Sequence, residues 1–200
     1  MKGFRRAKRA ELGIDEDTLV VFFAGNNFRL KGLQPLLFAL AILREKFPAR
    51  RLCLLVAGRG QISRYSRVAR KLGILDLTLF AGSVRDIERY YAAGDIYVHP
   101  TFYDSCSLTV LEALASGLPA ITSRFNGAAQ AITSAEAGKI LEDPANVEEL
   151  AESIAYYLDG NRRKVAQTAA RREVEKYSST YNVEETVRVY YEVVAEEARR

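Results

Sequence analysis

The sequence predicts an α/β fold, a Rossmann-like parallel sheet of about six strands with helices on both faces. The first observation behind this prediction is that short, continuous apolar runs recur along the chain, as expected of strands buried on both faces. The second is that these runs alternate with longer stretches whose apolar residues follow helical spacing. The third is the length of 200 residues without a linker or repeat, which suits one well-packed domain over residues 1–200.

The individual elements follow from this alternation. The first strand is the apolar run Thr18–Gly25, and the helix after it carries leucines at the spacing of one helical face. Pro35 falls in the first turn of this helix, where its missing N–H costs little. Further strands are predicted at Arg51–Gly58, Leu77–Gly82, Asp95–Pro100, Leu118–Ser123 and Gly138–Leu141. Helices are predicted up to Leu72 and over Val84–Ala93, Cys106–Ser116, Val147–Leu158, Arg162–Lys176 and Val183–Glu197.

Composition and charge narrow the function classes. The net charge is +4, with basic clusters at Arg5, Arg6, Lys8 and Arg9 and at Arg162, Arg163 and Lys164. Such clusters can face anionic lipid or nucleic acid, but no nucleic-acid motif accompanies them, and a solvated helix face is the favoured interpretation. The sequence contains no apolar run long enough to span a membrane. The two widely separated cysteines, Cys53 and Cys106, favour reduced thiols in a cytosolic protein.

The sheet directs attention to four loops. A parallel sheet of this kind binds its ligand at the carboxyl ends of the strands, where the strand order reverses. The loops concerned follow Gly25, Gly58, Gly82 and Pro100. We therefore expect the residues that carry chemistry to lie in these loops or at the start of the helices after them.

The segment Gly25–Gly32 places two cations at a helix N-terminus. Arg29 and Lys31 follow a buried strand, and the backbone N–H groups and helix dipole favour an anion at that point. The two side chains form a candidate diphosphate clamp, in which guanidinium and ammonium contribute differently. Exposed loop cations without a ligand are an equally good interpretation of this segment by itself.

The segment His99–Pro119 combines a strand end, a loop and a helix start. Asp104 lies in the loop, and the first N–H groups of the helix, at Ser107 and Leu108, are candidates to hold phosphate because they lack intrahelical partners. Glu112 lies beside apolar residues, where sugar hydroxyls would satisfy its carboxylate. The alternatives are helix capping by Asp104 and, for Glu112, an exposed carboxylate or a structural salt bridge.

Other chemistries find less support. The loop VAGRGQ, with Gly58 and Gly60, lacks the third glycine of a dinucleotide fingerprint and is interpreted as a tight turn that allows close approach. His99 is the one histidine, and we interpret it as a hydrogen-bonded core residue because no triad-like spacing surrounds it. No metal-ligand spacing is found, and tyrosines such as Tyr91 are interpreted as packing residues.

Taken together, these segments resemble retaining GT-B glycosyltransferases of family 4. Asp104-x7-Glu112 followed by ALASGLPAIT resembles the family's Glu-x7-Glu signature, and GNNFRLKG resembles its glycine-to-Lys-Gly loop. LFAGSVRDIERYYAAGDIYVHP and AGKILEDPANVEELAESI resemble two further blocks, in matching order from about Gly13 to Leu158. Within the family, the chain most resembles the bacterial lipopolysaccharide core glucosyltransferases.

The resemblance implies roles for individual residues. As catalytic residues it marks Glu112, which matches the glutamate on the ribose hydroxyls, and Asp104, which matches the glutamate that contacts the donor sugar. Lys31 matches the diphosphate lysine, and Arg29 lies near the usual arginine, whose place Asn26 occupies. The other implied donor-binding positions are Gly58, the amides of Ser107 and Leu108, and the loop beside the base at Gly82, Ser83 and Val84.

Three positions depart from the family pattern. Asp104 is one methylene shorter than the family glutamate, which puts its reach to the sugar in question. Asn26 leaves Arg29 as the candidate guanidinium of its loop, and Gln130 stands where many members carry a carboxylate. None of these changes affects the expected fold, but together they blur the identity of the donor.

The resemblance also implies what the whole chain does. It would be the C-terminal donor-binding half of a GT-B enzyme, without the N-terminal domain that binds the acceptor, and inactive by itself. The reaction implied is transfer of a hexose from UDP-glucose to a glycan or lipopolysaccharide acceptor, without a metal, in the cytoplasm with peripheral contact to the inner face of the cell membrane. The alternatives are a non-catalytic nucleotide-sugar-binding module with a drifted site and, more distantly, an epimerase or phosphorylase of related fold.

Overall fold

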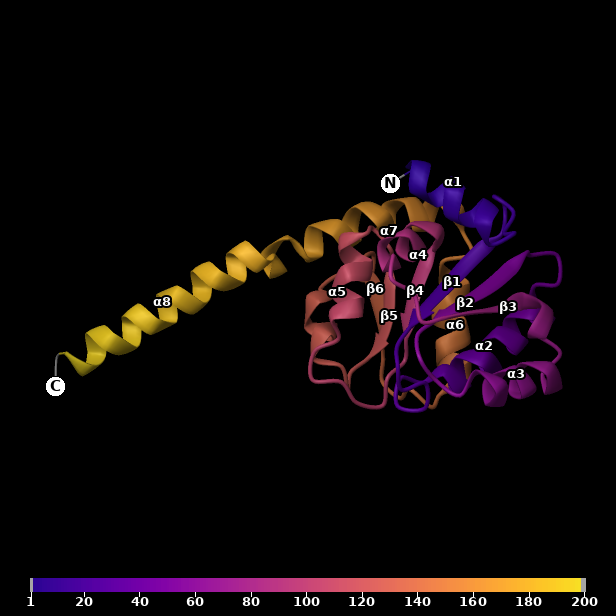
Figure 1. Ribbon diagram of the computed structural model, residues 1–200, viewed down its shortest axis with the longest axis horizontal. Coiled ribbons are helices and arrows are strands. Elements are labelled where there is room, and N and C mark those ends of the chain that lie inside the picture. The colour runs from indigo at the N-terminus through magenta and orange to yellow at the C-terminus, as the bar shows by residue number, and fades with distance from the viewer. Residues whose placement is uncertain (1, 199–200) are drawn as a thin grey trace.

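The computed structural model describes residues 2–198 and contains one six-stranded parallel sheet (Figure 1). Its strands are β1 (Leu19–Ala24), β2 (Leu52–Ala57), β3 (Thr78–Gly82), β4 (Ile96–His99), β5 (Ala120–Ser123) and β6 (Gly138–Leu141). They are arranged in the order β3-β2-β1-β4-β5-β6, so the order reverses between β1 and β4. This is the Rossmann order, and it confirms the predicted fold class and all six predicted strands.

Helices cover both faces of the sheet. They are α1 (Lys2–Glu11), α2 (Leu33–Lys46), α3 (Ile62–Lys71), α4 (Ile87–Ala93), α5 (Leu108–Ala115), α6 (Val147–Tyr156), α7 (Gly160–Glu173) and α8 (Ser179–Glu197). One hydrophobic core packs α2, α3 and α6 against the sheet, and a second core packs α4 and α5 against its other face. Strand β1 serves both cores, because Val21 and Phe23 point into the first while Val20 and Phe22 point into the second. Burial on both faces explains why its sequence is continuously apolar.

The N-terminal helix α1 is the main departure from the predictions. The basic cluster that it carries was expected to be a solvated helix face, and this is wrong for Lys8 and Arg9, which are 3% and 1% exposed. Arg9 Nη2 lies 2.7 Å from Asp95 Oδ2, and Arg9 also donates to the carbonyl oxygens of Thr18 and Ala93. A charge can be buried when it is paired and hydrogen-bonded, and here its partner lies at the start of β4, far along the chain. The second basic cluster stays largely exposed on α7, as predicted.

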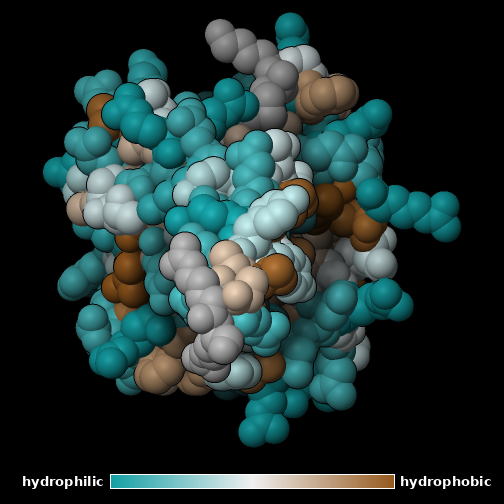
Figure 2. All heavy atoms as spheres, turned by 90° about the vertical axis from the view of Figure 1, so that its left-hand side faces the viewer, coloured by the Kyte–Doolittle hydropathy of each residue, from teal (hydrophilic) through white to brown (hydrophobic). Residues whose placement is uncertain are grey.

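Helix α8 extends away from the rest of the domain (Figure 1). None of its 19 residues is buried. One side of the helix carries exposed apolar residues at helical spacing, namely Val183, Val187, Tyr190 and Val194. Figure 2 looks along this helix and shows hydrophobic side chains beside hydrophilic ones on that face of the molecule.

The loops after β1 and β4 lie at one edge of the sheet, at the bottom of the domain in Figure 1. Gly32 is what lets them approach each other, because a Cβ there would lie 2.0 Å from the carbonyl oxygen of Pro100. Its φ of +77° is also in the left-handed region that favours glycine. The two segments that the sequence analysis selected therefore meet where the strand order reverses.

Candidate functional site

The centre of the site is an ion pair between those two loops. Lys31 lies in the loop between β1 and α2, and its Nζ is 2.5 Å from Oδ2 of Asp104 in the loop between β4 and α5. The two side chains are 19% and 15% exposed, so the pair remains reachable from solvent. The structure thus brings together the predicted diphosphate lysine and the predicted sugar-binding carboxylate. A donor that places its phosphate and its sugar here would contact both.

The neighbouring groups determine the protonation states of Asp104 and His99. Burial acts to raise the pKa of Asp104, but the hydrogen bond and charge of Lys31 outweigh it and hold that pKa below its usual value. His99 lies beside the pair, with Nε2 3.7 Å from Asp104 Oδ2, and is 1% exposed. Burial and the charge of Lys31 lower the pKa of His99 to about 4, so the ring is neutral at pH 7. Its Nδ1 lies 3.2 Å from the hydroxyl of Tyr97, which confirms the prediction of a hydrogen-bonded core histidine.

Helix α5 begins next to the ion pair. The amides of Leu108 and Thr109 form no hydrogen bond with any residue that the structure describes, so they are free to bind an anion. The amide of Ser107 is already used, since it donates to Oδ1 of Asn126 at 3.2 Å. Asn126 was not singled out from the sequence, yet it is 1% exposed and also donates to Thr122 through its Nδ2. It holds the start of α5 in place from the loop after β5.

Glu112 lies further along α5 and is exposed. Its Oε2 accepts a hydrogen bond of 2.8 Å from the hydroxyl of Tyr91 on α4, and it forms no salt bridge with a described residue. The packing role predicted for Tyr91 is confirmed, because its ring packs edge-to-face on Phe22 at 5.2 Å. The hydroxyl has a second role that the sequence could not reveal, which is to orient the Glu112 carboxylate. One carboxylate oxygen remains for a ligand.

The loops after β2 and β3 complete the edge. Gly58 donates its amide to the carbonyl oxygen of Gly82 at 2.7 Å, and a Cβ on Gly58 would lie 1.9 Å from the carbonyl oxygen of Gly25. The predicted tight turn at Gly58 therefore joins three strand ends. Ser83 is exposed next to this turn, while Val84 is half-buried against the second core. The loop that was predicted to lie beside the base thus borders the same edge as Lys31.

Asn26 and Arg29 are placed differently from Lys31. Oδ1 of Asn26 accepts a hydrogen bond of 3.0 Å from the amide of Arg59, which ties the β1 loop to the β2 loop. Arg29 lines a cavity whose lining contains neither Lys31, Asp104 nor Glu112. Arg29 and Lys31 belong to the same loop, but Lys31 pairs with Asp104 whereas Arg29 lines a separate cavity.

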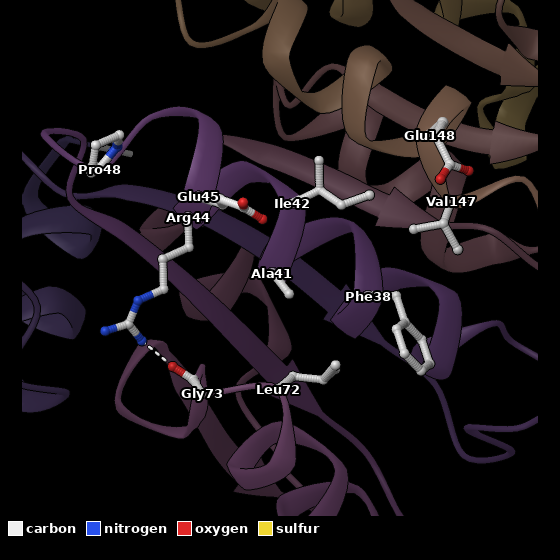
Figure 3. A pocket seen from close by; sticks show the side chains of 10 residues that line it. All are labelled: Phe38, Ala41, Ile42, Arg44, Glu45, Pro48, Leu72, Gly73, Val147 and Glu148. Carbon is white, nitrogen blue, oxygen red and sulfur yellow. Dashed lines mark hydrogen bonds between the residues drawn. The ribbon is translucent and has the colours of Figure 1, made fainter.

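The larger cavities of the domain are elsewhere. One of about 760 Å³ runs along α2 and is lined by apolar side chains such as Phe38 and Ile42 (Figure 3). Arg44 closes one end of it by donating to the carbonyl oxygen of Gly73, as the dashed line in Figure 3 shows. Among the described residues, no group of three or more His, Cys, Asp or Glu side chains is placed to hold a metal ion, and no described helix is long and apolar enough to cross a membrane.

Known proteins are similar to this chain in sequence and in fold. The lipopolysaccharide glucosyltransferase WaaG of Escherichia coli (strain K12) is 30% identical over 148 residues, covering 74% of this chain and 39% of that protein. The D-inositol 3-phosphate glycosyltransferase 2 of Catenulispora acidiphila is 33% identical over 173 residues, covering 80% and 40%. The crystal structure of WaaG superposes with a TM-score of 0.83 at 26% identity, covering 94% of this chain and 50% of WaaG. The structure of HepE of Anabaena, described in complex with UDP-glucose, shares the fold with a TM-score of 0.78 at 20% identity, covering 94% and 53%.

These similarities cover only part of each of the known proteins named above. The chain spans 39% and 40% of the length of the two relatives named above and 50% of the WaaG structure. The family described as glycosyl transferases group 1 matches residues 4–177, which is most of the chain. The chain therefore belongs to the group 1 glycosyl transferases, and it corresponds to the C-terminal domain of their GT-B fold.

Proposed function

We propose that this chain is the donor-binding domain of a retaining glycosyltransferase that transfers a hexose from UDP-glucose to a glycan or lipopolysaccharide acceptor. The observation that carries the proposal is the meeting of Lys31 with Asp104 beside the free amides of α5. The relative WaaG is named a lipopolysaccharide glucosyltransferase, and the fold neighbour HepE is described with UDP-glucose, which supports this choice of donor and acceptor class.

The geometry divides the donor among these groups. The diphosphate would take Lys31 from Asp104 and would also accept from the amides of Leu108 and Thr109. When the bond between sugar and diphosphate breaks, negative charge develops on the departing nucleotide, and fixed N–H groups and an ammonium are suited to stabilise it. Asp104, released from Lys31, would accept hydrogen bonds from the sugar hydroxyls, and Glu112 would accept from the ribose. Ser83 and Val84 would border the base.

The proposal needs no metal, because the cationic lysine and the helix N-terminus face the diphosphate directly. We propose that the acceptor is bound mainly outside these residues, since the chain matches only 39% of WaaG. The chain by itself would then bind the donor without transferring the sugar. A non-catalytic binding module is the alternative, and the observation in its favour is that Asn26 is engaged with the Arg59 amide instead of facing the ion pair.

The test is a titration of the chain with uridine, UDP and UDP-glucose, followed by amide chemical shifts with and without a chelator. A half-site of this kind is expected to bind UDP with a dissociation constant of about 0.1–1 mM. Lys31→Ala should weaken UDP about ten- to a hundredfold while leaving uridine unchanged, and high salt should reduce this loss. Glu112→Gln should weaken uridine and UDP by a similar factor. Asp104→Ala should weaken UDP-glucose relative to UDP without weakening UDP itself, because the diphosphate takes Lys31 from Asp104.

A matched control is Lys46→Ala, which removes the same charge from the exposed end of α2, the helix that follows the Lys31 loop. It should change none of these affinities. Equal losses for all three ligands in Lys31→Ala would show that Lys31 is not a diphosphate ligand. A Glu112→Gln variant that is folded and binds all three ligands normally would favour the alternative, a non-catalytic binding module. Sugar transfer by the chain alone would contradict the proposal that another domain binds the acceptor.

A further inference from the structure

A second cationic cavity lies near the donor site, where the loops after β1 and β2 meet. Its volume is about 470 Å³. Phe28 and Tyr65 form its apolar wall, with their rings edge-to-face at 5.5 Å. Gly60 leaves room for the Phe28 ring, because a Cβ there would lie 2.3 Å from it. The hydrogen bond from the Arg59 amide to Asn26 then holds the two loops together, so the cavity is preformed.

The lining of this cavity carries positive charge without compensation. Arg29 and Arg64 both line it, and no carboxylate does. Both side chains are exposed, and neither forms an ion pair with a residue that the structure describes, so their N–H groups are available to a ligand in the cavity. Two guanidinium groups at one cavity repel each other, and a bound anion relieves that repulsion. Each guanidinium also offers the fork of N–H donors that fits phosphate or carboxylate.

The cavity is separate from the place proposed for the nucleotide. Phe28 and Tyr65 belong to the core on the side of α2 and α3, whereas Tyr91, which holds Glu112, belongs to the core on the opposite face of the sheet. The Lys31–Asp104 pair lies between them at the sheet edge. An anion at Arg29 and Arg64 would therefore be a group additional to the diphosphate at Lys31 and to the ribose at Glu112.

A neighbouring cavity suggests the kind of molecule that carries this anion. It has a volume of about 370 Å³ and shares Arg29 and Tyr65 with the first. Phe38 and Phe102 line it and are 38% and 42% exposed. An apolar, aromatic wall with a few polar groups to fix orientation is typical of a small-molecule site. We infer that Arg29 and Arg64 bind a phosphate or carboxylate group of the acceptor, an inference that rests on the proposed function.

The experiment uses glucose 6-phosphate and glucose as paired probes on the chain, followed by amide chemical shifts. Glucose 6-phosphate should shift the amides of residues 26–29 and 59–65 to saturation, and glucose at the same concentration should not. Arg29→Gln and Arg64→Gln should each weaken this binding about tenfold. Arg70→Gln, which removes a charge from the exposed end of the same helix, should leave it unchanged. Binding of UDP to Arg64→Gln should equal that of the unmodified chain.

An inter-ligand nuclear Overhauser effect then tests the link to transfer. With UDP-glucose bound, contacts between its glucose and glucose 6-phosphate are expected, because donor and acceptor must lie side by side. The absence of such contacts would overturn the acceptor assignment. If UDP-glucose does not shift the amides of Leu108 and Glu112, the proposed function fails, and the acceptor assignment fails with it. The glucose 6-phosphate titration still shows in that case whether Arg29 and Arg64 form an anion site.

Two further outcomes would overturn the inference. One is that glucose 6-phosphate causes its largest chemical-shift changes at Lys31 and Leu108, or that Arg64→Gln binds it as tightly as Arg70→Gln does. The other concerns lipid, tested with phosphatidylglycerol vesicles against phosphatidylcholine vesicles. If the anionic vesicles bind in a manner that depends on Arg29 and Arg64 while glucose 6-phosphate leaves the cavity unshifted, the cavity recognises a lipid headgroup and not an acceptor glycan.

Discussion

At the scale of single residues, the site depends on partners that hold the ligand-binding side chains. Tyr91 orients Glu112, His99 lies against Asp104, and Asn126 fixes the start of α5. None of the three is exposed beyond a few per cent, so each acts from below the surface that a ligand would touch. Their effects should therefore appear as changes in the affinity or pH response of a neighbouring residue.

Tyr91→Phe should weaken uridine binding about three- to tenfold, because Glu112 loses a charge-assisted hydrogen bond that fixes its carboxylate. The measurement is the uridine titration by amide shifts, beside urea unfolding to confirm the fold. Tyr90→Phe is the matched control, since Tyr90 is its buried neighbour and its hydroxyl has no hydrogen bond with a described residue. Similar losses in both variants would contradict the positioning role of Tyr91.

His99 should make the stability of the chain depend on pH between 7 and 5. Burial and Lys31 lower its folded pKa to about 4 from 6.5, so the unfolded chain binds the proton first as the pH falls. The folded state consequently loses about 2 kcal/mol between pH 7 and pH 5, a window above the carboxylate pKa values. Urea unfolding at both pH values measures this, and His99→Gln should remove most of the difference. An unfolding free energy that is equal at pH 7 and pH 5 in the unmodified chain would refute it.

At the scale of elements, α1 shows how a charged helix becomes part of the domain. Arg5 and Arg9 both pair with Asp95 at 2.7 Å, and Asp95 also accepts from the amide of Val20. Lys8 adds an ion pair of 3.0 Å with Asp86 before α4. Burial disfavours the charge of Lys8, but its bonds to Glu11 and Asp86 outweigh this and raise its pKa. These contacts attach α1 to the start of β4 and to α4 by charge.

Arg9→Met should destabilise the domain by about 3–5 kcal/mol, because it leaves Asp95 and several carbonyl oxygens without their buried partner. Arg6→Met, an exposed position on the same helix, should cost about 0.5 kcal/mol or less. The measurement is the free energy of unfolding in urea at pH 7. Equal stability of the two variants would show that the Arg9–Asp95 pair contributes little beyond what a hydrophobic side chain supplies.

At the scale of the whole molecule, the domain and α8 are separable. The sheet and helices α2 to α7 share two cores and α1 is attached to them by ion pairs, whereas no residue of α8 is buried. Its apolar side, which includes Val187 and Val194, is exposed. Stability should therefore reside in the residues before α8.

Removal of residues 179–200 should leave the free energy of unfolding unchanged within about 0.5 kcal/mol, because no apolar surface of α8 is buried in the domain. Hydrogen exchange should likewise be faster in α8 than in the sheet. The control is a chain shortened before α7, which loses the buried Ala166 and Ala170 and should be clearly less stable. A loss of several kcal/mol on removing α8 alone would contradict this division.

Local sequence patterns determined the strands of the sheet and the loops in which the candidate site lies. The continuous apolar runs predicted the six strands, and the rule that ligands bind where strand order reverses selected the two loops that carry Lys31 and Asp104. Both rest on patterns that extend over a few residues. The predicted start of one helix was wrong: α4 begins at Ile87 and not at Val84, because residues 83–86 form the loop that brings Asp86 to Lys8.

The tertiary structure decided which side chains meet. Lys31 and Asp104 are 73 residues apart, Arg9 and Asp95 are 86 apart, and Tyr91 and Glu112 are 21 apart. No periodicity in the sequence links such positions, because each pair forms only after the strands have taken their order in the sheet. For the same reason a sequence pattern can mark a lysine as a ligand for phosphate, while only the folded chain shows that Arg29, two residues earlier, points into a different cavity.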